Sequence, residues 1–284
     1  MQTAAFYLKM SRDDSWYMDR PHFHESVEFL MPVSRGDQMF VENQVYDLRP
    51  SVLFILPDAT LHKTLASAPY ERYVLHVPLN TLRLLSTPQT DLYQRVLEVS
   101  RMVETGEKYT DLLALLKRLD WEQEHPSGAF GADIRQTNLL SQFLVEALSA
   151  APPAPEKGAR PRLLEQQVLP AEGEGTLQIS RVLDYLQENI TEKLTLDQIA
   201  SEFFISKYYL SHCFKAATGF SVMEYLINIR ILKARRLLQD GVRVQLAGEL
   251  AGFRNNEHFI RSFTTLTGIS PKQYAKQFSN GDKQ

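Results

Sequence analysis

The chain has 284 residues, a length that predicts two domains at roughly 100–200 residues per domain. Hydrophobic residues make up 44% and charged residues 23%, a mixture that excludes collagen-like, rod-like coiled-coil and wholly disordered chains. A single cysteine, Cys213, excludes an internal disulfide framework and a multi-cysteine metal site. No window contains the roughly 20 consecutive apolar residues of a membrane span, and the N-terminus lacks the pattern of a signal peptide. We therefore expect a cytoplasmic protein with no membrane partner.

The formal net charge of −3 is unevenly distributed along the chain. Residues 1–175 contain 17 Lys and Arg against 24 Asp and Glu, whereas residues 176–284 contain 14 against 10. A basic C-terminal part joined to an acidic N-terminal part indicates that only one half binds a polyanion. The basic excess is modest for a nucleic-acid-binding domain, so charge alone does not identify the partner.

The N-terminal domain, residues 1–150, is predicted to begin with β-structure. Between residues 20 and 78, short apolar runs alternate with turn sequences, and this spacing predicts a small barrel or sandwich. The runs are Val27–Val33, Gln38–Val41, Val45–Leu48, Val52–Leu56 and Tyr73–Val77. From Leu79 to Leu148 the apolar residues recur at three- and four-residue steps, which predicts amphipathic helices. We expect the helices between Leu92 and Leu148 to form a homodimer contact, the alternative being a helical cap on a monomer.

Residues 151–175 have the composition of a linker. The stretch from Ser149 to Thr176 holds five of the fourteen prolines and three of the glycines. Proline removes backbone donors and glycine weakens regular structure, so we expect at most a short helix around Leu163–Val168. Residues 176–280 are predicted to form a second domain containing helices only, the first of them over Leu177–Asn189.

The C-terminal domain contains an internal repeat. Shifting residues 210–225 by 49 positions superposes them on residues 259–274, and the pairs that match are Phe214 and Phe263, Thr218 and Thr267, Gly219 and Gly268, Ser221 and Ser270, and Tyr225 and Tyr274. A shorter helix is predicted before each copy, over Leu196–Phe204 and over Val244–Ala251. A long helix over Ser221–Leu238, with basic residues Arg230, Lys233, Arg235 and Arg236, joins the two copies. Two helices separated by a tight turn form the helix-turn-helix plan, which is present here twice.

The spaced residues of both copies resemble the AraC-type DNA-binding domain. They are Ile199, Ala200, Leu210, Phe214, Lys215, Gly219, Tyr225, Arg230, Ala234, Leu237, Leu238, Gly252, Phe253, Phe259, Phe263, Gly268, Ser270, Pro271 and Tyr274. The resemblance covers roughly residues 176–278 and identifies the chain as similar to the AraC/XylS family. It implies two recognition helices in successive major grooves, promoter DNA as partner, and RNA polymerase as a second partner. The second copy departs from the family pattern at Gly248, at Thr264 and Thr265, and at Ala275, which bears on its affinity for DNA.

Each recognition helix is expected to bury apolar anchors and to turn its remaining side chains toward DNA. The predicted DNA-binding residues are Lys207, Tyr208, Ser211, His212, Lys215, Arg254, Asn256, Glu257, Ile260 and Arg261. Arg261 is suited to a guanine edge, Asn256 to adenine and Glu257 to cytosine. The cations Lys207, Lys215 and Arg254 are suited to phosphates. For His212 the alternative is a polar surface residue without contact to DNA.

A second set of residues, in the N-terminal domain, resembles the cupin metal site. His22, His24, Glu28 and His62 follow the order of that pattern, and the spacing of the first two places both imidazoles on one face of a strand. Two His and a carboxylate suit Fe, Mn or Ni, so one alternative is a divalent metal. The other is a metal-free effector pocket, since AraC-type regulators often keep this pattern without metal. Met39, Tyr46, Arg72 and His76 complete the predicted effector site.

Two functions follow from these patterns. In the first, a cupin-like barrel with packed helices senses a small molecule, and the double helix-turn-helix domain binds a promoter as a regulator, here expected to be an activator without enzymatic activity or cofactor. In the second, the barrel is a metal-dependent enzyme fused to a DNA-binding domain. The linker and the duplicated motif favour the first function, because an enzyme does not need a domain that recognises a DNA sequence. The family resemblance implies a sugar or a sugar derivative as the effector.

Overall fold

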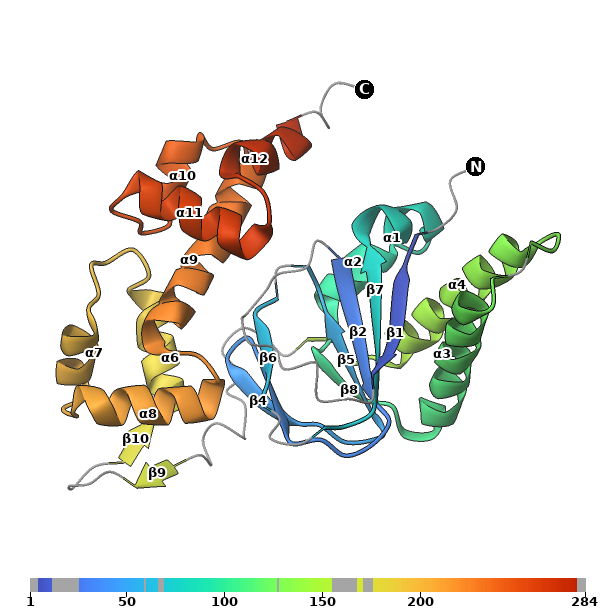
Figure 1. Ribbon diagram of the computed structural model, residues 1–284, viewed down its shortest axis with the longest axis horizontal. Helices are drawn as coiled ribbons and strands as arrows, with labels where there is room; N and C mark the ends of the chain where they lie inside the picture. The colour runs from blue at the N-terminus through green and yellow to red at the C-terminus, as the bar shows by residue number, and fades with distance from the viewer. Residues whose placement is uncertain are drawn as a thin grey trace.

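The computed structural model describes residues 5–11, 26–58, 60–65, 69–126, 128–154, 168–170 and 176–279. These residues form an N-terminal domain of sheets and helices and a mainly helical C-terminal domain (Figure 1). The predicted combination of an α+β part with a helical part is confirmed. In the ranges just given, none of the helices is both long and apolar enough to span a membrane.

The described strands of the N-terminal domain form two antiparallel sheets, of order β1-β7-β2-β5-β8 and β4-β3-β6. Their bounds are β1 Tyr7–Ser11, β2 Ser26–Pro32, β3 Gln38–Val41, β4 Gln44–Asp47, β5 Val52–Leu56, β6 His62–Thr64, β7 Arg72–Pro78 and β8 Met102–Glu104. Among these strands no hydrogen-bonded ladder joins one sheet to the other. The chain therefore forms two sheets here, and the closed barrel expected from the sequence is absent from this set of strands.

The five-stranded sheet is buried on both faces. Phe29 of β2 packs edge-on against Phe143 at a centroid distance of 5.6 Å, within an apolar core shared with the helices. Leu30, on the opposite face, belongs to a second apolar core together with Met39 and Val41 of β3. Because residues alternate between the faces of a strand, β2 contributes to both cores. The helices that complete the domain are α1 Leu79–Leu85, α2 Leu92–Glu98, the 3₁₀ turn η2 Gly106–Lys108, α3 Tyr109–Glu124 and α4 Ala132–Ala150.

The segment before the C-terminal helices differs from the sequence prediction. Val168–Pro170 (β9) pairs antiparallel with Thr176–Gln178 (β10), so this part of the chain is not purely helical. The predicted first helix is corrected at its start, because pairing with β9 keeps residues 176–178 extended and α6 begins at Ile179. Of the short helix expected in the linker, residues 163–167 lie outside the described residues.

The C-terminal domain consists of two helix-turn-helix units on one long helix, α9 (Figure 1). The helices are α6 Ile179–Glu188, α7 Leu196–Glu202, α8 Lys207–Thr218, α9 Val222–Gln239, α10 Val244–Leu250, α11 Asn256–Thr267 and α12 Pro271–Ser279. Capping boxes begin α7 at Thr195 and α9 at Ser221. Gly219 and Gly268 end α8 and α11 in the left-handed region, with φ of +75° and +78°, which glycine adopts without a steric penalty.

One of the four basic residues of α9 is buried. Arg235 is 3% exposed, and its Nε donates a hydrogen bond to the hydroxyl of Tyr274 at 3.1 Å. Its guanidinium also lies 4.0 Å from the carboxylate of Asp58 in the N-terminal domain. The hydroxyl and the carboxylate offset part of the cost of burying this guanidinium, and the sequence of α9 alone does not reveal them.

Candidate nucleic-acid interface

The second helix of each unit, α8 or α11, has the division of faces expected of a recognition helix. Leu210, Cys213 and Phe214 anchor α8 in the apolar core, and Phe259 and Phe263 anchor α11. Ser206 caps the start of α8 by accepting a hydrogen bond from the backbone N–H of Tyr209, and Asn255 caps α11 in the same way. Both helices therefore start immediately after the turn of their unit, with their first turn at the protein surface.

The predicted DNA-binding residues lie on the outward faces of these helices. Lys207, Tyr208, His212 and Lys215 on α8 are exposed and Ser211 is half-buried, while Arg254, Asn256, Glu257, Ile260 and Arg261 on or next to α11 are all exposed. The rings of Tyr208 and His212 stack at a centroid distance of 6.3 Å, which presents a flat surface near the start of α8. The structure thus gathers each predicted set on one accessible helix face.

Two of the three predicted phosphate-binding cations, Lys207 and Arg254, contact other residues of the protein. The Nζ of Lys207 lies 2.9 Å from the carboxylate of Asp197 on α7. Arg254 donates to the carbonyl oxygen of Thr191 at 3.5 Å and lies next to Arg230. Partial burial, together with the positive charge of Arg254, lowers the pKa of the Arg230 guanidinium. A phosphate oxygen between these two guanidiniums would reduce their mutual repulsion.

The turn of the first unit contains a feature that the sequence reading missed. Phe204 has a φ of +55° and is 95% exposed, so an aromatic side chain occupies a left-handed position in contact with solvent. The equivalent residue of the second unit, two positions beyond the end of α10, is Gly252 with a φ of +99°. A shift of 48 positions, one less than the shift that superposes the second helices, aligns Phe204 with Gly252 in the sequence. A left-handed backbone conformation raises the free energy of a bulky residue, so Phe204 is in a strained conformation.

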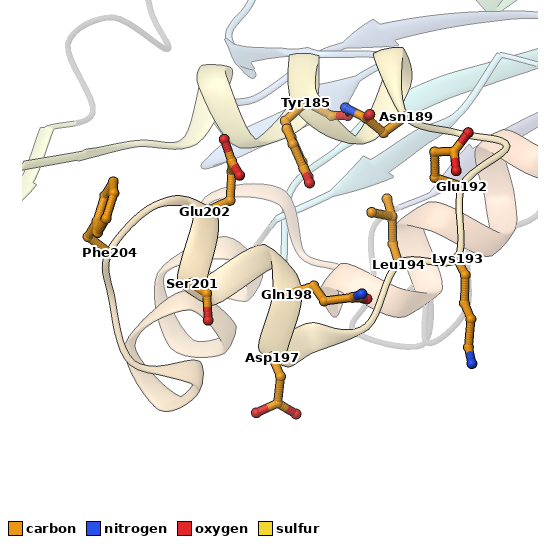
Figure 2. A pocket seen from close by; sticks show the side chains of 10 residues that line it. All are labelled: Tyr185, Asn189, Glu192, Lys193, Leu194, Asp197, Gln198, Ser201, Glu202 and Phe204. Carbon is orange, nitrogen blue, oxygen red and sulfur yellow. Dashed lines mark hydrogen bonds between the residues drawn. The ribbon is translucent and has the colours of Figure 1, made fainter.

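Figure 2 shows a surface pocket between α6 and α7 with a volume of about 670 Å³. Its lining residues are Tyr185, Asn189, Glu192, Lys193, Leu194, Asp197, Gln198, Ser201, Glu202 and Phe204. Glu192, Asp197 and Glu202 give it an acidic character. None of the predicted effector-binding residues lines this pocket, so it is distinct from the site that the sequence indicates.

The predicted effector site is centred on a buried carboxylate–imidazole pair. The Oε2 of Glu28 lies 3.3 Å from the Nε2 of His62, and both side chains are 2% exposed. The Nδ1–H of His62 donates to the carbonyl oxygen of Thr60 at 3.0 Å. Burial disfavours a charged imidazole, but the carboxylate of Glu28 outweighs it and holds the pKa of His62 above its ordinary value. His22 and His24 lie outside the described residues.

The remaining predicted effector residues lie around this pair. His76 is the cross-strand neighbour of Glu28 and therefore shares its face of the sheet. Arg72, on the same strand and the same face, stacks over the ring of Tyr70 at 4.6 Å. Tyr70 is a buried aromatic neighbour that the sequence reading did not single out.

Met39 and Tyr46 are cross-strand partners on the three-stranded sheet and line the same apolar core. Burial, with a contribution from the Glu42 carboxylate, raises the pKa of Tyr46 to about 12, so its phenol stays protonated. It donates a hydrogen bond to Gln44. Of the eight predicted effector residues, six lie in the described part of the chain, on strands of the two sheets.

The described residues supply only part of a cupin-type metal site. Glu28 and His62 are adjacent, but within the part of the chain that the structure describes no group of three or more His, Cys, Asp or Glu is arranged to hold a metal. The Nε2 of His62 points to Glu28 while its Nδ1 is held by a backbone carbonyl, which is a common orientation for a ligating imidazole. Glu28 and His62 are thus two residues whose side chains could ligate a metal.

Comparison with known proteins identifies the C-terminal domain. A helix-turn-helix domain family matches residues 199–277. YijO of Escherichia coli, named as an HTH-type transcriptional regulator, is 33% identical over 98 residues, which are 34% of this chain and 35% of that protein. YobQ of Bacillus subtilis, also named as an HTH-type transcriptional regulator, is 22% identical over 254 residues, 89% of this chain and 87% of that protein.

Among solved structures, the C-terminal domain of AraT, a response regulator from Geobacillus stearothermophilus, is 30% identical with a TM-score of 0.34. The similarity covers 35% of this chain and 84% of that structure. The similarity to YijO likewise spans only about a third of that relative's length, 35%. The family match and the similarity to YijO thus concern the region of the two units described above, which is similar to helix-turn-helix domains of proteins named as transcriptional regulators.

Proposed function

We propose that this protein is a sequence-specific transcription regulator whose N-terminal domain, a cupin-like pair of sheets, senses a small molecule. The observation that supports this most directly is the pair of helix-turn-helix units, each with a polar, accessible recognition face. We further propose that the protein activates transcription by contacting RNA polymerase at the promoter, and that it acts as a regulator and not as an enzyme. In this proposal, the effector is a sugar or a sugar derivative.

The three-stranded sheet supports the proposal that an effector controls DNA binding. The inner face of β3 contributes Met39 and Val41 to the core between the two sheets. Phe40, between them in the sequence, points the other way and packs into the core of the first helix-turn-helix unit. A change at the effector site that displaces this sheet would therefore also displace its contact with the C-terminal domain.

The segment that leads into β6 connects the same two places. His62 pairs with Glu28 in the predicted effector site, whereas its neighbour Leu61 is buried in the apolar core of the first helix-turn-helix unit. Asp58, four residues before His62, lies against Arg235 of α9. A small molecule that hydrogen-bonds to Glu28 and His62 would act on this segment directly. Carboxylate and imidazole groups suit the hydroxyl groups of a sugar. A thermal-shift screen with sugars tests this step, because a ligand of the native state raises the unfolding temperature.

DNA binding by residues 176–284 is the first expected result. The affinity of this fragment for DNA should fall steeply with salt, because each phosphate contact releases counterions. Fluorescence anisotropy at several salt concentrations measures the slope of log K against log [salt]. A fragment that is folded by circular dichroism but binds no DNA at low salt would refute the proposed function.

Arg261→Ala and Lys215→Ala should have different consequences. Arg261 is exposed on α11, and its loss should cost about 1–3 kcal/mol and relax base preference at one position of the binding site. Lys215→Ala should weaken binding to all sequences alike and reduce the salt slope by about one contact. Competition binding with single-base variants of a selected site separates the two effects. Identical profiles for the two variants would show that the assignment of base and phosphate contacts is wrong.

Dimerisation is expected through α4. Ile134 and Val145 are 58% and 48% exposed, and their separation of eleven residues places them on one side of the helix. We expect the full chain to sediment as a dimer at tens of micromolar and Val145→Glu to shift it toward the monomer. Leu84→Glu is the matched control, since Leu84 is an exposed apolar residue of α1 outside the proposed contact. A wild-type monomer, or equal effects of the two variants, would contradict this placement.

A further inference from the structure

The internal repeat gives the C-terminal domain two equivalent tyrosines, Tyr225 and Tyr274. Each lies four residues after a capping serine, and its backbone N–H donates to the carbonyl oxygen of that serine, at 3.0 Å in α9 and 2.9 Å in α12. Both side chains are 1% exposed. A buried phenol must place its hydroxyl against a partner, so the partners of these two hydroxyls show what surrounds each unit.

The hydroxyl of Tyr225 is bound by the N-terminal domain. It donates to the Oδ1 of Asn43, in the turn between β3 and β4, at 2.6 Å. The ring of Phe40 lies 6.3 Å from the ring of Tyr225, in an edge-on arrangement that fixes the tyrosine further. This contact joins the start of α9 to the three-stranded sheet.

A second set of contacts surrounds the first. The Nζ of Lys63 on β6 donates to the carbonyl oxygen of Gly219 at 2.7 Å and lies 5.5 Å from the ring centre of Phe220. Gly219 is so close to the sheet that a Cβ there would lie 2.7 Å from a side-chain carbon of Leu65. The sheet therefore meets the end of α8 and the start of α9 as a closely fitted surface.

The hydroxyl of Tyr274 is connected to the N-terminal domain through one intermediate residue. Arg235 of α9 donates to it from Nε at 3.1 Å and lies 4.0 Å from Asp58. The Arg235 and Asp58 side chains are 4% and 10% exposed, and Asp58 also accepts a hydrogen bond from the hydroxyl of Tyr93 at 2.9 Å. A carboxylate of the N-terminal domain thus lies at the junction between α9 and the second unit.

The two contacts are made near opposite ends of one helix. Tyr225 and Arg235 are ten residues apart on α9, or about 15 Å along its axis. The first unit packs around the start of this helix and the second around its end. Any bend of α9 between these points changes the angle and the distance between α8 and α11, which carry the recognition faces.

We propose that Asn43 and Asp58 are positioning residues for DNA recognition: they hold α9 at two points and so fix the separation at which the two units read DNA. None of the contacts described in this subsection involves a predicted base-contacting residue, and Asn256, Glu257 and Arg261 remain exposed. The N-terminal domain therefore sets the relative position of the two recognition faces without covering them. This inference rests on the proposed DNA-binding function.

The test uses the full chain and a DNA site selected from a random library with the wild-type protein. Binding is then measured to that site and to the same site with two base pairs inserted between its halves, which rotates one half by about 70° relative to the other. Wild type should lose about tenfold or more in affinity upon insertion, because one unit loses its base contacts. The double variant with Tyr225→Phe and Asp58→Asn should bind the original site almost as well as wild type does. Its affinity should fall only about threefold upon insertion.

Asp47→Asn is the matched control, because it removes a carboxylate of the same domain that hydrogen-bonds to Gln38 within its own sheet. Its insertion penalty should equal that of wild type. Tyr225→Phe alone keeps the aromatic packing, and it provides a second measurement if Asp58→Asn lowers folding stability. The inference is overturned if wild type shows no insertion penalty, if the variants keep the wild-type penalty, or if they bind the original site more tightly. Failure of wild type to select any DNA would instead overturn the proposed function itself.

Discussion

Glu28→Ala is expected to lower the free energy of unfolding of the N-terminal domain by about 3–5 kcal/mol. The carboxylate lies 3.3 Å from the imidazole of His62, and both side chains are 2% exposed. Its removal leaves a buried imidazole without the neighbour that favours its charged form, and it opens a cavity beside β2 and β7. Chemical denaturation of the full chain, followed by circular dichroism and tyrosine fluorescence, measures the loss for each transition separately.

Replacing both partners of the pair should be less harmful than replacing one. In Glu28→Gln with His62→Gln, neither residue is charged and the two amides can hydrogen-bond to each other, so the loss should be well below that of Glu28→Ala. The metal content of the purified wild type, measured by mass spectrometry, is the second readout. Stoichiometric metal that is lost in Glu28→Ala would favour the metal-site alternative. A loss of stability below about 1 kcal/mol would contradict the expectation that the pair stabilises the domain.

The sequence predicted best those elements whose hydrophobic pattern is local. Val52–Leu56 was expected as a strand and is β5, because five consecutive apolar residues suit a strand buried on both faces. The strand β6, His62–Thr64, was missed because His-Lys-Thr has no apolar run. It forms by pairing with β3, a partner more than twenty residues away in the sequence, so local propensity does not reveal it.

The candidate DNA interface was predictable for a similar reason. A repeat within one chain shows which positions are anchors, and the residues between the anchors must face outward. The contacts between the two domains were not predictable. Asn43 and Asp58 are typical turn residues, and Arg235 is one of four basic residues in the sequence of α9. Only the three-dimensional arrangement brings Asp58 to Arg235, 177 positions apart.

The same repeat explains why the second unit departs from the family pattern at Gly248. Gly248 is the fifth residue of α10 and faces Phe259, the fourth residue of α11; a Cβ at Gly248 would lie 2.7 Å from the Phe259 ring. The equivalent pair in the first unit is Ala200 with Leu210, both buried in one apolar core. Each unit thus combines one larger and one smaller residue, and the sum of their volumes is similar.

Gly248→Ala is therefore expected to destabilise the second unit by about 1–3 kcal/mol through overpacking. The ring of Phe259 has little freedom to move, since it packs between Phe253 and Phe263 at centroid distances of 5.2 and 5.7 Å. Adding Phe259→Leu should recover most of this loss, because the pair then has the composition of the first unit. Phe259→Leu alone should cost about 1 kcal/mol by leaving a cavity beside Gly248.

Thermal and denaturant unfolding of the four proteins of this cycle give the coupling energy between the two positions. We expect the two substitutions to compensate, so that the double variant is more stable than Gly248→Ala alone. Ala216→Gly, at an exposed position of α8, is the control for helix propensity and should lower stability by about 1 kcal/mol. By propensity alone, the reverse exchange in Gly248→Ala would raise stability by a similar amount. Additive losses at the two positions would contradict the volume argument. Because alanine is the better helix former, any destabilisation by Gly248→Ala must come from its contact with Phe259.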